Sequence, residues 1–475
     1  MATPLDDSRD ALLALLRAAP DLRRGEGVDA ILGILAERRR MDLSGLPPQE
    51  QARLIATRTV DILPSQEAFA DRIGAARSKG RDLVVKFGID PTGADVHLGH
   101  TVPMIVASRM QRMGHHVVFI VGDITALIGD PSGRTGDRPP LTMDDIRRNL
   151  ATYRQQVSPF FDFDRAEFRF NSEWLGRITL PDLLGTLEKL PVSASLQRED
   201  FRKRMAEGTG LTMAELLYSV VMALDSVELV CDVELGGVDQ LLNMQMCRRV
   251  MEVSGQEPEI VVTTALIEGT DGTGAKMSKS KGNYVPLSAD PADMFGRMMS
   301  IPDRLVPAYL RALTEMLDPE IAELERLLGR GTLHPMGVKM LMAGAVVGAI
   351  HGPAAAAAAA GEFHKQFSER RYSQVADVPG VAVGKVAASS LADILVTEAG
   401  LRSRSEVRRV AQQGGLRLVR ELPGGDQETV GLTEANALAP LADLVAGHEG
   451  WFAAPGDARL FLKCGRVLLA LEPAS

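Results

Sequence analysis

Two short segments, far apart in the chain, carry side chains suited to binding phosphate. His97-Leu98-Gly99-His100 supplies two imidazoles and a glycine where a strand-like run gives way to a helical one. Lys276-Met277-Ser278-Lys279-Ser280 supplies two ammonium groups in a loop flanked by glycines. Alone, each segment also fits capping histidines or a solvated lysine loop. Together they predict a site that binds ATP triphosphate and stabilises the charge on leaving pyrophosphate.

Two further segments could complete a nucleotide site. Gly236-Gly237-Val238-Asp239-Gln240 follows an apolar run, so backbone could approach a ligand closely and Asp239 could accept from ribose hydroxyls. The segment Thr125 to Arg134 places Asp130 in an otherwise apolar turn, where its carboxylate could pair with an ammonium group. Each of these segments alone also fits an ordinary turn or helix cap.

Apolar runs predict the strands that position these segments. They alternate with turn signals and helical spacing, a pattern typical of a parallel sheet in an α/β fold. Ligands bind such sheets at the carboxyl ends of the strands, where the turns lie. The predicted strands are 83–89, 116–121, 229–235 and 259–264.

The flanking regions have a different character. Residues 1–50 have helical spacing and predict one or two short helices, separated by Pro47-Pro48 from the remainder of the chain. The seven alanines of 354–360 predict the middle of a helix. From about residue 388 a basic helix start at Ser403–Arg409 and short strands indicate a small separate domain. After about residue 290, helices are predicted at 294–299, 306–316, 319–328 and 336–350.

Composition narrows the class of protein. A chain of 475 residues with 45% hydrophobic residues can form two to four domains. The net charge of -9 argues against a wholly basic nucleic-acid binder but leaves room for local basic patches. Three widely spaced cysteines form no metal or disulfide framework and favour a reducing cytoplasm. Met1 to Asp10 is not a signal peptide, and no apolar run reaches the ~20 residues of a membrane span.

In their order along the chain, these motifs resemble the bacterial tyrosyl-tRNA synthetases, which are class I aminoacyl-tRNA synthetases. The resemblance runs from about residue 59 to the end and includes 86–93, 128–133 and 232–240. Lysine two residues before Gly88 places the chain in a lysine-containing branch. The resemblance implies an α/β fold: a Rossmann-like parallel-sheet catalytic domain, then an α-helical domain and a small α+β RNA-binding domain. The implied domains are an N-terminal helical extension (1–58), the catalytic domain (59–290) with a dimer-interface insertion at about 145–225, an α-helical anticodon-binding domain (291–385) and a ribosomal-protein-like RNA-binding domain (388–475).

The resemblance also implies the reaction of a tyrosine–tRNA ligase. L-tyrosine and ATP, with Mg²⁺, would form tyrosyl-adenylate, and the acyl group would pass to the 3′ end of tRNA(Tyr). It implies a cytoplasmic homodimer with no resident metal, no membrane partner and no DNA partner. No protein nucleophile is required, so catalysis would rest on positioning and charge stabilisation.

By position, the resemblance assigns roles to particular residues. The catalytic residues would be His97, His100, Lys276 and Lys279. The ATP-binding residues would be Gly88, Asp90, Thr92, Gly99, Gly237, Asp239 and Ser278. The amino-acid-binding residues would be Lys86, Thr125, Asp130, Tyr218, Met222, Asp225 and Gln240, with Asp225 accepting from the phenol. The tRNA-binding residues would be Arg404, Arg408 and Arg409.

One helix departs from the family pattern and leaves alternatives open. Met222 stands where the family has a glutamine that holds the substrate amino group, and methionine supplies no amide. The pocket is either repacked around tyrosine or belongs to a paralogue that activates a related amino acid. A tryptophan-type synthetase, a metabolic adenylating enzyme and an inactive RNA-binding protein are further alternatives. Asp225 favours tyrosine over tryptophan, and the intact histidines and lysines argue against an inactive protein.

Overall fold

The computed structural model forms two compact units, Met1–Ala356 and Ala357–Ser475. Gly133 and Arg134, which belong to one predicted motif, lie outside the described residues. The structure describes residues 4–132, 142–196, 198–208, 210–364, 372, 375, 378–422, 427–452, 458–465 and 467–472.

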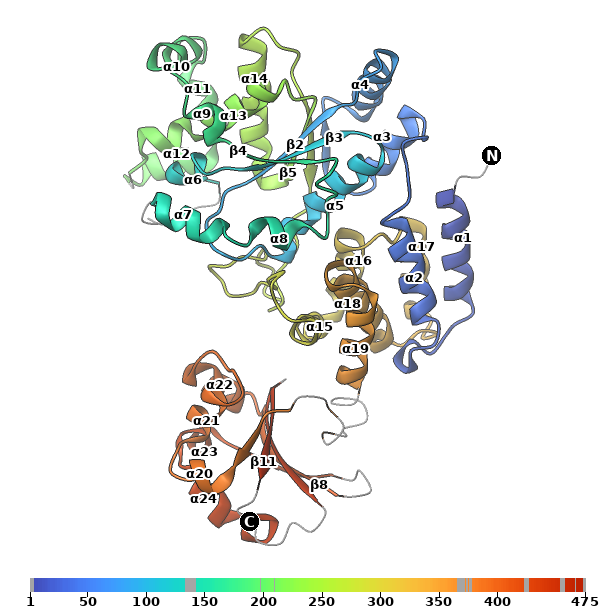
Figure 1. Ribbon diagram of the computed structural model, residues 1–475, viewed down its shortest axis with the longest axis vertical. Coiled ribbons are helices and arrows are strands. Elements are labelled where there is room, and N and C mark those ends of the chain that lie inside the picture. Colours follow the sequence, from blue (N-terminus) through green and yellow to red (C-terminus); the bar gives the residue numbers. More distant parts are fainter. Residues whose placement is uncertain are drawn as a thin grey trace. The chain divides into compact units, whose positions relative to one another are not determined.

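A six-stranded sheet forms the centre of the first unit (Figure 1). All neighbouring strands are parallel except β1, which is antiparallel to β6. The predicted parallel sheet is confirmed, but β5 begins at Val233 rather than 229, because Leu229 ends a helix and Val230 turns into the left-handed region at φ 47°. The spatial order is β1 (Asp61–Leu63), β6 (Ile260–Thr264), β5 (Val233–Gly237), β2 (Val84–Ile89), β3 (His116–Val121) and β4 (Glu167–Phe170).

Two crossover helices flank this sheet. Helix α5 (Leu98–Arg112) joins β2 to β3, and α14 (Leu241–Val253) joins β5 to β6. Because β3 and β6 lie on opposite sides of the β2–β5 pair, right-handed crossovers place α5 and α14 on opposite faces (Figure 1). The strand order therefore reverses between β2 and β5, whose carboxyl ends bound the crevice where such folds bind ligands.

Helices make up the rest of the first unit. The sequence predicted that Pro47-Pro48 separates the N-terminal helices from the remainder of the chain. Instead, Pro48 is the first residue of a third helix, a position that proline favours. Helix α16 ends at Leu313, earlier than predicted, because Thr314 is extended.

The N-terminal helices are α1 (Pro4–Arg17), α2 (Val28–Arg38) and α3 (Pro48–Ala56). Helix α4 (Gln66–Ser78) precedes β2, and α13 (Met213–Leu229) packs on α14. Between β3 and α13 lie α6 (Thr125–Ile128), α7 (Met143–Leu150), α8 (Tyr153–Val157), α9 (Ser172–Leu175), α10 (Leu180–Leu187), α11 (Val192–Ser195) and α12 (Glu199–Ala206). After β6 come α15 (Pro291–Met299), α16 (Val306–Leu313), α17 (Asp318–Gly329) and α18 (Pro335–His351).

The second unit is a five-stranded sheet with short helices. Only the β11–β7 pair is parallel among its described strand pairs. Its core includes Leu391, Leu395, Val407, Leu416 and Leu462. The alanine run lies in α19 (Pro353–Phe363), as predicted. The strand order is β7 (Gly380–Ala382), β11 (Val467–Glu472), β10 (Arg459–Cys464), β8 (Leu416–Glu421) and β9 (Gln427–Gly431). The helices are α20 (Val383–Val386), α21 (Leu391–Thr397), α22 (Arg404–Gln412), α23 (Glu434–Leu438), α24 (Leu441–Gly447) and α25 (Glu449–Phe452).

Candidate active site

A cavity of ≈ 510 Å³ opens at the crevice between the carboxyl ends of β2 and β5. It is lined by both strand ends, the start of α5, helix α13 and the lysine loop. The structure brings together here every residue predicted to act in catalysis, ATP binding or amino-acid binding; their individual roles stay predictions. The shared lining consists of Lys86, Gly88, Asp90, Thr92, His97, Gly99, His100, Thr125, Asp130, Tyr218, Met222, Asp225, Gly237, Asp239, Gln240, Lys276, Ser278 and Lys279.

Both histidines are organised by the first turn of α5. The His97 Nδ1 accepts from the Gly99 N–H at 3.1 Å, and the His100 Nδ1 accepts from the His97 N–H at 3.2 Å. Burial, together with the nearby Lys279, lowers the pKa of His97 to about 3, and burial and His97 lower the pKa of His100 well below its usual value. Both rings are therefore neutral, and since each Nδ1 accepts, each Nε2 carries a proton to donate. A Cβ at Gly99 would lie 2.9 Å from the His97 ring, so glycine is required there.

The two lysines reach the cavity from an anchored loop. Met277 is buried and its N–H donates to the Ile267 carbonyl at 2.9 Å. The Lys276 Nζ lies 2.7 Å from Asp239 Oδ2, and the Lys279 Nζ donates to the Gly93 carbonyl at 3.2 Å. Both ammonium groups thus lie beside the cavity with backbone or carboxylate oxygens as partners, which an anionic ligand could replace.

Asp90 lies at the end of β2 and joins groups from three elements. Tyr218 donates its hydroxyl to Asp90 Oδ2 at 2.9 Å, and Thr125 donates to Oδ1 at 2.7 Å. Burial raises the pKa of this carboxyl to about 7. Gly122 makes the arrangement possible, because a Cβ there would lie 2.1 Å from Asp90 Oδ1. Asp90, predicted to bind ATP, is therefore held by residues predicted to bind the amino acid.

Asp130 is held by a set of polar side chains at the start of α14. The Gln240 Nε2 donates to Asp130 Oδ2 at 2.7 Å, and the Ser132 N–H donates to Oδ1 at 2.8 Å. Asn243, which the sequence did not single out, donates to Gln240 Oε1 at 2.8 Å. Asn243 follows Gln240 by three residues at a predicted helix start, and this spacing could have indicated that the two side chains meet.

Asp225 is a buried residue of the cavity lining, and it is fixed by two residues that sequence reasoning missed. Trp174 donates its indole N–H to Asp225 Oδ1 at 2.7 Å, and Asn171 donates to Oδ2 at 3.4 Å. Burial raises the pKa of Asp225 to about 6, while Lys86 opposes that shift. Trp174 is one of two tryptophans in the chain, and this rarity was the only hint of a special role. Nothing in the sequence around Trp174 indicates a contact with Asp225.

Lys86 is buried beside Asp225 and belongs to a charged cluster. Its Nζ lies 2.6 Å from Glu234 Oε1 and donates to Ser226 Oγ at 2.6 Å. Burial lowers the pKa of Lys86, but the surrounding acidic groups outweigh it and hold the pKa above its usual value. Ligand atoms of Glu234, Cys247 and Glu259 lie within 4.8 Å of one another, as a metal would need. The Lys86 ammonium already supplies a positive charge to this cluster.

Met222 lines the cavity and packs against an apolar cluster that includes Val220, Ala223 and Cys247. Met222, at the position where the resemblance implies a glutamine, thus packs as an apolar side chain. This packing agrees with a pocket that is repacked at this position.

The three arginines predicted to bind tRNA lie on α22 in the second unit. Arg404 is paired with Asp393, and Arg408 lies 2.5 Å from Glu434. Arg409 is exposed. Among the residues that the structure describes, no helix is both long and apolar enough to cross a bilayer.

Comparison with known proteins identifies the family. The family model "tRNA synthetases class I (W and Y)" matches residues 78–368. The tyrosine–tRNA ligase of Thermotoga maritima is 41% identical over 371 residues, covering 78% of this chain and 90% of that protein. The enzyme of the same name from Aquifex aeolicus is 38% identical over 373 residues, covering 78% of this chain and 92% of that protein.

Solved structures agree on the fold. A C-terminally truncated mitochondrial tyrosyl-tRNA synthetase from Aspergillus nidulans matches with a TM-score of 0.57 at 21% identity, over 68% of this chain and 94% of that chain. A tyrosyl-tRNA synthetase from Archaeoglobus fulgidus, complexed with L-tyrosine, matches with a TM-score of 0.52 at 19% identity, over 65% of this chain and 99% of that chain. The chain belongs to the class I tRNA synthetases of the tryptophan and tyrosine group. It is an aminoacyl-tRNA synthetase, and the predicted family and fold are confirmed.

Proposed function

We propose that this chain is a tyrosine–tRNA ligase. The observation that carries the proposal is one cavity whose lining joins the imidazoles of His97 and His100 and the ammonium groups of Lys276 and Lys279 to the buried carboxylate of Asp225. Relatives that this chain resembles over most of its length are tyrosine–tRNA ligases, which supports the same substrate here.

In the first step, the carboxylate of L-tyrosine attacks the α-phosphate of ATP, and pyrophosphate leaves. The Nε2–H groups of His97 and His100 donate to phosphate oxygens, since their Nδ1 atoms are already occupied. Lys276 leaves Asp239 and, with Lys279, stabilises the charge on pyrophosphate. Asp239 is then available to the ribose. Mg²⁺ accompanies ATP, and tRNA(Tyr) takes the acyl group in the second step.

The amino acid lies with its ring toward Asp225. The phenol donates to this carboxylate, which Trp174 and Asn171 orient. Asp130 and Gln240 lie across the cavity, where a carboxylate and an amide can receive the substrate ammonium and carboxylate groups. With Met222 in place of the amide, the network around Asp130 takes over the recognition of the ammonium group.

The proposal includes tRNA contact and dimerisation. Arg404, Arg408 and Arg409 on α22 bind RNA phosphates, and Arg404 and Arg408 exchange their carboxylate partners to do so. Binding therefore weakens steeply with salt. The enzyme acts as a homodimer.

The test is amino-acid-dependent exchange of pyrophosphate into ATP, run with each of the twenty standard amino acids. Exchange with tyrosine alone is expected. Lys279→Ala should reduce kcat by roughly 10²- to 10³-fold, since it removes charge stabilisation that operates mainly in the transition state. Exchange with tryptophan alone, or with none of the twenty, overturns the tyrosine assignment, and the second outcome favours a related amino acid.

A further inference from the structure

The N-terminal extension, residues 4–58, precedes the region that the family model matches, 78–368. It is nevertheless packed into the first unit, with α1 against α17 and α2 against α18 (Figure 1). Two of its arginines, Arg38 and Arg58, are buried. Both reach the short segment Thr314–Asp318 that leads from α16 to α17, and this shared target suggests a role.

Arg38 is the last residue of α2 and binds both that segment and the first turn of α17. Its guanidinium binds both carboxylate oxygens of Glu320, at 2.8 and 2.5 Å, and donates to the Glu315 carbonyl at 3.1 Å. Ser8 of α1 accepts from its Nε at 2.9 Å. Arg38 is 1% exposed and Glu320 0%, so this pair is sealed from water.

Arg58 lies just after α3 and holds the same segment from another direction. It donates to the Met316 carbonyl and lies 2.9 Å from Asp318 Oδ1. Together the two arginines satisfy the carbonyls of Glu315 and Met316, which fixes where the Glu315 side chain can point.

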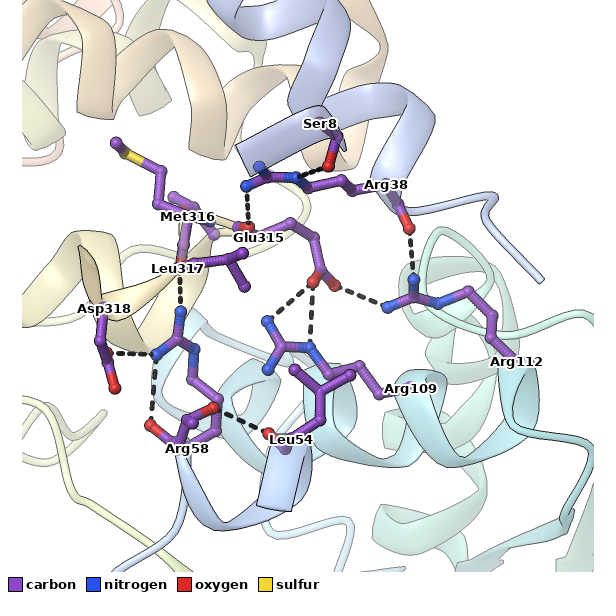
Figure 2. A network of polar contacts seen from close by, with 12 residues as sticks. Ser8, Arg38, Leu54, Arg58, Arg109, Arg112, Glu315, Met316, Leu317 and Asp318 are labelled. Carbon is purple, nitrogen blue, oxygen red and sulfur yellow. Dashed lines mark hydrogen bonds and ion pairs between the residues drawn. The ribbon is translucent and has the colours of Figure 1, made fainter. Parts of the chain in front are cut away.

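The Glu315 side chain in turn clamps the end of α5 (Figure 2). Arg109 donates to its Oε2 at 2.9 and 2.7 Å, and Arg112 donates to its Oε1 at 2.9 Å. The extension also touches α5 directly: the Leu43 N–H donates to the Arg112 carbonyl at 2.9 Å, and Arg112 donates to the Arg38 carbonyl. The last turn of α5 is therefore held by Glu315 and by the extension.

Helix α5 carries His97 and His100 at its other end. A helix of this length is a rod of about 22 Å, so a shift at one end displaces or tilts the other. We propose that Arg38 is a positioning residue, which fixes α5 through Glu315 and thereby places the two histidines. The role in catalysis rests on the proposed function; the mechanical role does not.

The test compares Arg38→Met with Arg17→Met in the full-length protein. Arg17 also joins the extension to α17, through Glu323 at 3.3 Å, but it is exposed and does not touch Glu315. Arg38→Met should lower kcat of tyrosine-dependent pyrophosphate exchange by roughly twofold to thirtyfold. The KM for tyrosine should stay unchanged, because Asp225 and Tyr218 lie on α13. Arg17→Met should exchange like the wild type.

A second readout is independent of activity. Amide deuterium uptake in α5, measured by mass spectrometry, should be faster in Arg38→Met and normal in Arg17→Met. If Arg38→Met does not fold because Glu320 is left without its partner, Arg38→Met/Glu320→Leu removes both charges and should show the same two effects.

Three outcomes overturn the inference. They are a folded Arg38→Met protein with wild-type kcat, normal deuterium uptake in α5 of that protein, or an equal loss of kcat in Arg38→Met and Arg17→Met. A wild-type protein that exchanges no pyrophosphate with tyrosine instead defeats the proposed function. In that case the uptake in α5 alone decides whether Arg38 holds this helix.

Discussion

At the scale of single residues, burial and charge act in opposite directions on two carboxyls of the charged cluster around Lys86. Burial raises the pKa of Glu259 well above its usual value, and the adjacent Glu234 adds to this shift. Burial also acts on Glu234, but the Lys86 ammonium at 2.6 Å outweighs it and lowers the pKa. Two adjacent buried carboxyls cannot both ionise beside one lysine. Burial thus favours the neutral form of Glu259, while the contact with Lys86 favours the charged form of Glu234.

This assignment predicts opposite consequences for two matched substitutions. Glu259→Gln replaces one neutral polar group by another and should change the free energy of unfolding by about 1 kcal/mol or less. Glu234→Gln leaves the Lys86 charge without its ion-pair partner and should cost about 3–5 kcal/mol. Urea unfolding of both variants measures the two values. A larger loss for Glu259→Gln would show that the proton lies on Glu234 instead.

At the scale of elements, α5 links the candidate active site to the helices after β6. Its first turn holds His97 and His100 beside the cavity, and its last turn meets Glu315. Burial alone would raise the pKa of Glu315, but Arg109 and Arg112 outweigh burial and lower the pKa to about 2. The carboxylate is therefore ionised in the folded protein at neutral pH.

The lowered pKa predicts how stability depends on pH. In the unfolded chain Glu315 returns to its usual pKa near 4.5, so the unfolded state takes up a proton first as the pH falls. The stabilisation from this group is present above about pH 4.5 and is lost as the pH falls through about 2. Glu315→Gln lacks this contribution. Urea unfolding of both proteins from neutral pH downward should show the gap between them narrowing in acid; a gap that widens there contradicts the ion pairing.

At the scale of the whole molecule, the segment from α10 to the first residue of α13 exposes large apolar side chains. Each is more than half exposed, which is unusual for such residues on one stretch of a monomer. They support the proposed dimer, which would cover them. The residues are Leu180 at 68%, Leu184 at 53%, Val192 at 60%, Met205 at 56% and Met213 at 71%.

A charge placed on this segment should prevent dimerisation. Leu184→Asp would bury a carboxylate at the interface, so sedimentation should show a shift toward monomer at concentrations where the wild type is dimeric. Leu438→Asp is the matched control, because Leu438 has a similar exposed fraction, 48%, but lies in the second unit. Equal sedimentation of the wild type and Leu184→Asp as dimers would place the interface elsewhere.

Much of the fold could be predicted from local sequence. The run His116–Val121 is strand β3 with the bounds predicted, because an apolar stretch between turn signals has few other ways to be buried. His97 and His100 could be placed because their geometry is set within one helical turn. The arrangement of the two histidines is thus a local property of the chain.

The sequence by itself therefore predicted a parallel sheet with four of its six strands, and its resemblance to a family indicated the residues that meet in the cavity. Only the tertiary structure decided what orients them: Trp174 lies 51 residues from Asp225, Arg109 lies 206 from Glu315, and Arg38 lies 282 from Glu320. The period of apolar residues reports which face of an element is buried. It does not report which buried polar groups meet, because those pairs are chosen by the packing of distant elements and by the need to satisfy every buried charge.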